Sequence, residues 1–275
     1  MKIFRRLRSI ASVKFNRSHA VRHLLAGAIA VLLLTSCASV VNQFVYTPTA
    51  LPEPAQQWAQ TNDATTFEVT TDDGITLTGM QLSPKGTPRD TILYFHGNGG
   101  NLIKAATFVK PLRDRGYDVY VATYRGYSGN PGTPREVGLM KDGEAFLRST
   151  KTKPIVIGFS LGGAVALHLA AKTNLKAVTT IGAFTSLRSM TKVPTLTDDR
   201  YDNIAAIKQI TEPVLLVHGT KDHVVPFEQS RLLREAAVNH NVRLYRLEGA
   251  DHEIDAEVFA EIFDEQISQL PMGVQ

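Results

Sequence analysis

Short strand-like runs recur from residue 92 to residue 247, and stretches of helical periodicity lie between them. The runs are 92–95, 119–124, 155–159, 177–181, 214–218 and 242–247. Strands that alternate with helices in this way favour a mostly parallel sheet with helices on both of its faces. The sequence therefore predicts an α/β fold.

A β-hairpin is expected before this alternation begins. Two runs that favour strands, 66–70 and 75–81, flank Asp72-Asp73-Gly74, and Asp-Gly between such runs is a strong hairpin signal. Among the helices, 161–171 follows the third run and 255–269 closes the domain. Another is expected to start at Thr133-Pro134-Arg135-Glu136, which has the form of a capping box with proline in the first turn.

The chain has 275 residues, of which 43% are hydrophobic. That is enough for one domain with a sizeable core. We expect a signal peptide over 1–36, a tether over 37–62 and the folded domain over 63–275. In the tether, Pro48, Pro52 and Pro54 favour extended chain, although Phe44, Val45 and Tyr46 offer apolar side chains that can pack on the domain instead.

The positive charge of the chain is concentrated at the N-terminus. Residues 1–36 contain seven Lys or Arg and no acidic residue, which leaves 23 basic against 26 acidic residues in the rest of the chain. A nucleic-acid-binding protein needs a basic stripe on its folded part. The charge pattern shows none, so we expect no nucleic-acid partner.

An export signal is predicted from residues 24–37. The apolar run from Leu24 to Leu34 is too short to span a bilayer, which takes about 20 residues, but it suits the core of a signal peptide. Leu34-Thr35-Ser36-Cys37 resembles the bacterial lipobox, and Cys37 is the one cysteine of the chain. We expect Cys37 to be acylated and to anchor the protein to the cell envelope. Ala38 in place of Asp favours the outer over the inner membrane. The alternative is an uncleaved anchor helix with a chance cysteine.

Gly158-Phe159-Ser160-Leu161-Gly162 has the form G-x-S-x-G between a predicted strand and a predicted helix. Small residues on both sides of Ser160 allow a sharp turn that pushes the hydroxyl outward. The N-terminus of the following helix favours negative charge at this point. The alternative is a glycine-rich turn with an incidental serine.

Over about residues 65–270 the chain resembles the α/β-hydrolase superfamily. It is most similar to small-lid serine hydrolases, which include protein depalmitoylases and bacterial hydrolases without an assigned substrate. The matching blocks are Tyr94 to Asn101, Tyr124 to Tyr127, Gly158 to Gly163, His218 to Asp222 and Val225-Pro226.

The resemblance implies a nucleophile at Ser160, an acid at Asp222 and a base at His252, in the family's chain order. Asp251 is the tempting alternative acid because it adjoins His252, but neighbouring side chains usually point apart. The resemblance also implies an oxyanion hole built by Leu161 and Asn98.

These residues predict a serine hydrolase that cleaves a carboxylic ester or thioester through an acyl-enzyme. A peptidase or an acyltransferase would use the same three residues, and a non-catalytic envelope lipoprotein could use the fold as a binding module. We expect no cofactor, since no Lys-Ser/Thr pair follows the glycines of 97–100, and no metal. The pocket walls are expected from the loops 99–104, 127–132 and 185–197.

Overall fold

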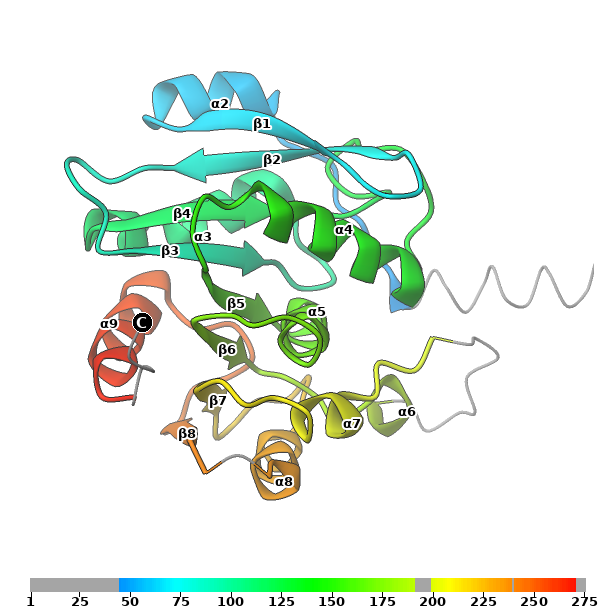
Figure 1. Cartoon of the computed structure of the whole chain (residues 1–275), viewed down its shortest axis with the longest axis vertical. Coiled ribbons are helices and arrows are strands. Elements are labelled where there is room, and N and C mark those ends of the chain that lie inside the picture. The colour runs from blue at the N-terminus through cyan, green and yellow to red at the C-terminus, as the bar shows by residue number, and fades with distance from the viewer. Residues whose placement is uncertain (1–44, 191–198, 239, 271–275) are drawn as a thin grey trace, which may run out of the picture.

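The computed structural model describes residues 45–190, 199–238 and 240–270, and an eight-stranded sheet forms its centre (Figure 1). The strand order is β1-β2-β4-β3-β5-β6-β7-β8. β1 and β2 form the predicted hairpin, β2 runs antiparallel to β4, and all other neighbours are parallel. The strands are β1 (Thr65–Thr70), β2 (Thr76–Leu82), β3 (Asp90–Phe95), β4 (Tyr117–Ala122), β5 (Ile155–Phe159), β6 (Ala177–Ile181), β7 (Val214–Gly219) and β8 (Val242–Leu247).

Helices cover both faces of the sheet, as the alternation predicted (Figure 1). α2 (Ala55–Thr61), α3 (Leu102–Asp114) and α9 (Ala256–Ser268) cover one face. The other face carries α4 (Glu136–Ser149), α5 (Leu161–Ala170), α7 (Asn203–Ile207) and α8 (Glu228–Ala236), and the short α6 (Leu187–Met190) lies in the connection between β6 and α7. Strand side chains alternate between two cores: in β3, Leu93 and Phe95 pack on the α5 side, and Ile92 and Tyr94 pack on the α3 side.

The sheet reverses its winding direction at β3. The chain continues from β3 to β4 on one side, and β5 then pairs with the other side of β3. Loops that leave the carboxyl ends of two such strands diverge and form a crevice, where ligands bind in folds of this class. The loop after β3 and the turn after β5 meet at this point.

α4 begins later than the capping box predicted. Its first residue is Glu136, and Arg135 is the N-cap without a side-chain capping bond. The Glu136 carboxylate accepts hydrogen bonds from the backbone of Arg200 and Tyr201, and Asp199 accepts from the Glu136 N–H at 3.2 Å. Residues distant in sequence therefore take the place of the local cap that the motif favours.

The segment before the sheet packs on the domain. Val45 and Tyr46 are buried, and α2 buries Trp58 and Ala59. From Val45 on, the expected tether is therefore part of the fold, because these apolar side chains gain more by burial than free chain would gain in entropy. Cys37 and the expected signal peptide lie outside the described residues. No helix among the described residues is long and apolar enough to cross a bilayer.

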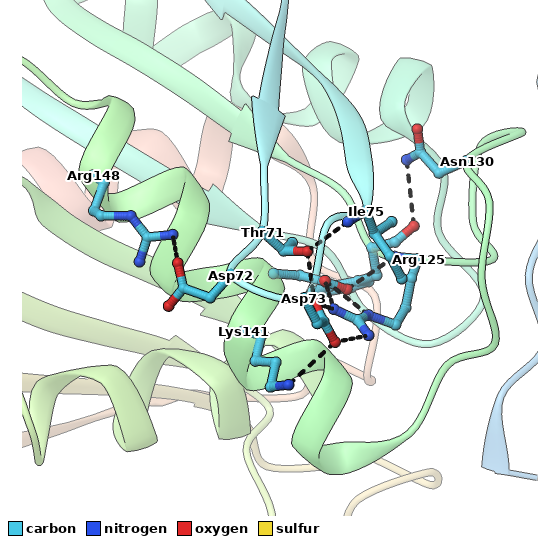
Figure 2. A network of polar contacts seen from close by, with 10 residues as sticks. Thr71, Asp72, Asp73, Ile75, Arg125, Asn130, Lys141 and Arg148 are labelled. Carbon is cyan, nitrogen blue, oxygen red and sulfur yellow. Dashed lines mark hydrogen bonds and ion pairs between the residues drawn. The ribbon is translucent and has the colours of Figure 1, made fainter.

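A buried ion network fixes the loop after β4 (Figure 2). Arg125 donates to Asp142 of α4 through its backbone N–H and its Nε, both at 2.9 Å, and its guanidinium forms a two-pronged contact with Asp73 of the hairpin turn. The Arg125 side chain is 7% exposed and that of Asp142 is fully buried. The network therefore ties together the loop after β4, α4 and the hairpin turn.

Candidate active site

Ser160 lies in a strained turn between β5 and α5. Its φ of 51° and ψ of −112° place it outside the regions that a residue with a side chain prefers. The turn is held because the Ser160 N–H donates to Ile181 O at 2.8 Å and the Gly163 N–H donates to Ser160 O at 2.9 Å.

The two glycines of the motif are required by close backbone contacts. A Cβ on Gly158 would lie 2.1 Å from the carbonyl oxygen of Gly162, and a Cβ on Gly162 would lie 2.2 Å from the carbonyl oxygen of Phe95. Any larger residue would push the helix away from the strand. The spacing of the motif is thus a steric consequence of the turn that presents Ser160.

The structure brings His252 and Asp222 together. Asp222 follows β7, His252 follows β8, and His252 Nδ1 lies 2.7 Å from Asp222 Oδ2. The other carboxylate oxygen of Asp222 accepts from the N–H groups of Val224 and Val225 at 2.9 and 2.7 Å. The carboxylate accepts at both oxygens, so the hydrogen on the His252 ring is assigned to Nδ1, which leaves Nε2 as an acceptor.

Asp251 has different partners. Its carboxylate lies 3.1 Å from His223 Nδ1 and accepts from the backbone N–H of His223 and of His252. The Asp251 side chain is 59% exposed, whereas that of Asp222 is 1% exposed. Of the two candidate acids, Asp222 is therefore the one in contact with the His252 ring.

The charge on Asp222 is stabilised by hydrogen bonds. Burial by itself would raise the pKa of this carboxyl group, but contacts with His218, His252 and the Val225 N–H hold the pKa well below its ordinary value. Gly182 leaves room for this pair. Its φ is +58°, and a Cβ there would lie 3.1 Å from His252 Nδ1.

Ser160 and His252 line one cavity of about 460 Å³. In the part of the chain that the structure describes, the Ser160 hydroxyl makes no hydrogen bond to another group; in sites without substrate, such contacts are often long. Most of the wall is apolar. The lining residues are Tyr94, His96 to Gly100, Lys104, Ala105, Phe108, Phe159, Ser160, Ile181, Val224 and His252 to Ile254.

Of the two expected oxyanion residues, Asn98 lines this cavity, and Leu161 directly follows Ser160, which lines it. Leu161 is the first residue of α5, and Asn98 lies in the loop after β3. Among the described residues, no protein group accepts the backbone N–H of either one. The Asn98 side chain is fixed, because its Oδ1 accepts from the Thr47 N–H at 2.9 Å and from the Tyr127 hydroxyl at 2.8 Å.

The cavity walls differ in part from the prediction. Loop 99–104 lines the cavity, but no residue of 127–132 or 185–190 does, and 191–197 lies outside the described residues. Tyr127 does not line the cavity, but its hydroxyl donates a hydrogen bond to Asn98, which does. Sequence reasoning missed Tyr94 and Phe108, because a residue in a buried strand or an amphipathic helix looks the same whether it faces a core or a cavity. It also missed Val224 and Ile254, which lie in the loops that carry Asp222 and His252.

Two histidines near the site are buried, His96 just after β3 and His218 within β7. His96 contacts Gly97 O through Nδ1 at 2.8 Å, and burial lowers its pKa to about 4. His218 contacts Ser230 and Val225 O. Within the described ranges, no three His, Cys, Asp or Glu side chains gather as a metal site would require.

Comparison with known proteins identifies similar chains. A family model described as the alpha/beta hydrolase fold matches residues 90–203. Protein bem46 of Schizosaccharomyces pombe is 34% identical over 196 residues, which cover 61% of this chain and 63% of bem46. The chain thus spans less than two thirds of that relative.

A human relative and a solved structure match over more of their length. Human alpha/beta hydrolase domain-containing protein 17B is 30% identical over 210 residues, and the match covers 72% of each chain. An esterase from Pyrococcus furiosus superposes with a TM-score of 0.65 at 20% identity, over 82% of this chain and 99% of the esterase. At this identity, the superposition shows a shared fold.

Proposed function

Because the chain belongs to the α/β-hydrolase family, we propose that it is a serine hydrolase that cleaves a carboxylic ester or thioester. Ser160 is the nucleophile, His252 the general base and acid, and Asp222 the residue that orients His252. One observation carries the proposal: Ser160 and His252 line the same cavity, and Nδ1 of the His252 ring contacts a buried carboxylate at 2.7 Å.

In the first half of the reaction, the Ser160 hydroxyl attacks the carbonyl carbon of the substrate and gives its proton to His252 Nε2. The carbonyl oxygen becomes an oxyanion, and the N–H groups of Leu161 and Asn98 are the donors available to it. Asp222 stabilises the imidazolium that forms. The C–O or C–S bond then breaks, and the leaving alcohol or thiol takes the proton from His252.

In the second half, water replaces the leaving group. The acyl group is now an ester of Ser160, and His252 Nε2 removes a proton from a water molecule that attacks the same carbonyl carbon. Collapse of the second tetrahedral intermediate returns the proton to Ser160 Oγ and releases a carboxylic acid. Only the substrate and water are consumed, so the proposal needs no cofactor.

The cavity supports esters over peptides. It is about 460 Å³ and mostly apolar, so it suits a small to medium acyl group, whereas a peptide needs polar partners for its backbone along an extended groove. We therefore place ester or thioester hydrolysis ahead of peptide hydrolysis.

The test combines covalent labelling with turnover. An active-site fluorophosphonate should label wild type and fail to label Ser160→Ala, and peptide mapping should place the label on Ser160. A panel of p-nitrophenyl esters and acyl thioesters from two to twelve carbons then ranks substrates by kcat/KM. Full activity of pure Ser160→Ala, or a label on another residue, would contradict the mechanism. Faster hydrolysis of peptides would contradict the substrate class.

The anchor is a second, separate proposal. The apolar run 24–34 and the Leu34-Thr35-Ser36-Cys37 sequence support export, cleavage before Cys37 and acylation of Cys37, with the outer membrane favoured by Ala38. Cys37→Ser should release the protein from the membrane fraction of the producing cell. An unmodified Cys37 in the mature native protein, measured by mass spectrometry, would overturn this proposal.

A further inference from the structure

Tyr94 is a buried tyrosine whose hydroxyl has no partner among the described residues. It lies in β3, is 3% exposed and lines the cavity that contains Ser160. Buried tyrosine hydroxyls normally find a hydrogen-bond partner. In this protein Tyr124 donates to His96 O at 2.9 Å and Tyr127 to Asn98 at 2.8 Å. The Tyr94 hydroxyl makes no such bond with any residue that the structure describes, so its hydrogen-bonding capacity is left to the contents of the cavity.

The surroundings of Tyr94 are apolar. Its ring packs on Phe108 with 5.6 Å between the ring centroids, and Ala105 and Ile181 line the same cavity. Burial raises the pKa of the hydroxyl above its ordinary value, which keeps it neutral and protonated at physiological pH. The hydroxyl is therefore a neutral donor beside apolar walls, and a ligand that displaces water from it has to replace that hydrogen bond.

The sheet register sets the distance between this donor and the nucleophile. Tyr94 pairs with Ile157, three residues before Ser160 on the neighbouring strand. At about 3.3 Å per residue, the Tyr94 backbone lies roughly 10 Å back from Ser160 along the strand direction. An acyl chain bound to Ser160 could reach the Tyr94 ring several carbons beyond its carbonyl.

The acyl group is the part of the substrate that fits this buried end. The leaving group must depart to solvent before water attacks, whereas the acyl group stays bound to Ser160 and needs an enclosed place. We propose that the acyl group of the substrate carries an oxygen acceptor, such as an ether, a hydroxyl or a second carbonyl, that receives a hydrogen bond from Tyr94. This inference rests on the proposed function of Ser160 and names the substrate class.

The test measures binding, so it does not depend on turnover. In the Ser160→Ala background, affinities are measured by calorimetry for octanoate and for its analogues in which oxygen replaces one methylene at carbon 4, 5, 6 or 7. The same series is repeated with Tyr94→Phe added. For at least one oxygen position, we expect Tyr94→Phe to weaken the oxygen analogue relative to octanoate by about two- to tenfold, the range of one hydrogen bond.

Tyr120→Phe is the matched control. Tyr120 is also 3% exposed and its hydroxyl also lacks a partner in the described part of the chain, but it lies on the opposite face of the sheet against Phe67 and does not line the cavity. For every oxygen analogue, Tyr120→Phe should leave the ratio of its affinity to that of octanoate unchanged. Thermal melting of each variant checks that the fold is kept.

Three outcomes would overturn the inference. Equal affinity ratios with and without the Tyr94→Phe change would mean that the hydroxyl meets only water. An equal loss for octanoate and all its analogues would mean a structural role. Absence of binding by any carboxylate would place the acyl group elsewhere. The proposed function fails separately, by lack of fluorophosphonate labelling and of ester turnover in wild type.

Discussion

His218 Nε2 lies 3.2 Å from Asp222 Oδ2, the same oxygen that His252 contacts. The His218 ring is fully buried, and its Nε2 also lies 2.8 Å from Val225 O, while Nδ1 lies 2.6 Å from Ser230 Oγ. A carbonyl and a carboxylate oxygen only accept, so Nε2 carries a hydrogen and the Asp222 carboxylate has histidines on two sides.

We expect His218→Phe to change the pH dependence of the reaction. The ring can still pack on Phe227, from which it lies 5.7 Å between centroids, but the donor to Asp222 is lost. With fewer donors, the carboxylate attracts the His252 imidazolium more strongly, so the acid limb of the kcat/KM profile should move to higher pH. An unchanged limb with a lower kcat would indicate disturbed packing alone. Ser230→Ala, which removes a contact on the far side of the ring, serves as the milder control.

The two candidate acids should differ strongly in effect. Asp222→Asn removes the charge that orients His252, and a comparable change in another triad costs about 10⁴ in kcat. Asp251→Asn alters an exposed group bonded to His223 and to backbone, so it should cost about tenfold or less, on the order of 1.4 kcal/mol. Steady-state kinetics with one ester substrate compares them. A larger loss for Asp251→Asn in folded protein would contradict the assignment of the acid.

Asn98 should depend on Tyr127 for its position. Tyr127→Phe removes one of the two donors that hold Asn98 Oδ1 and leaves the ring in place. We expect kcat to fall by roughly two- to tenfold, the range of one hydrogen bond, with little change in KM, because the loop is needed most when the oxyanion forms. A change confined to KM would argue against this role. Thr47→Pro removes the other donor, the Thr47 N–H, and Thr47→Ala keeps it as a control. A similar fall in kcat in Thr47→Pro alone would show that the N-terminal segment helps to position Asn98.

Stability should fall on acidification because His96 is buried without charge. Burial lowers its pKa to about 4 from an ordinary value near 6.5. Between these two values the unfolded chain binds more protons than the folded one, so stability rises with pH over this window and is lost as pH falls through it. The full effect is about 3 kcal/mol. Urea unfolding of wild type and His96→Asn at pH 4 to 7 measures it, and an equally steep pH dependence in both would contradict it.

The network in Figure 2 offers a paired test of buried and exposed charges. Asp142→Asn should cost about 2 to 3 kcal/mol of unfolding free energy, because it removes the fully buried carboxylate that accepts from Arg125, while Asp73 still pairs with the guanidinium. Asp72→Asn breaks the ion pair with Arg148, whose two side chains are 51% and 69% exposed, and should cost less than about 1 kcal/mol. Similar losses in the two variants would mean that the buried ion network of Arg125 stabilises the fold no more than an exposed ion pair does.

The fold could be predicted because its determinants are local. Apolar runs such as 155–159 and 177–181 mark buried strands at positions that the structure confirms, and Asp-Gly marks the hairpin. The turn at Ser160 was also readable, since a Cβ on Gly158 would lie 2.1 Å from the carbonyl oxygen of Gly162, four residues further on. In these places each residue meets neighbours close to it in sequence, so the pattern alone carries the information.

Tertiary structure alone decided the contacts between distant segments. Asp222 and His252 are 30 residues apart, and their pairing depends on the adjacency of β7 and β8. The folded chain brings residues 199–201 to the start of α4. There the Glu136 carboxylate accepts from the Tyr201 N–H and Asp199 accepts from the Glu136 N–H, and these two contacts replace the predicted capping box. Tyr94 has the sequence context of any core residue; only the tertiary packing around it, including Ala105 and Phe108 of α3, leaves a cavity that Tyr94 lines. These features depend on which side chains meet through space, and no local spacing encodes that.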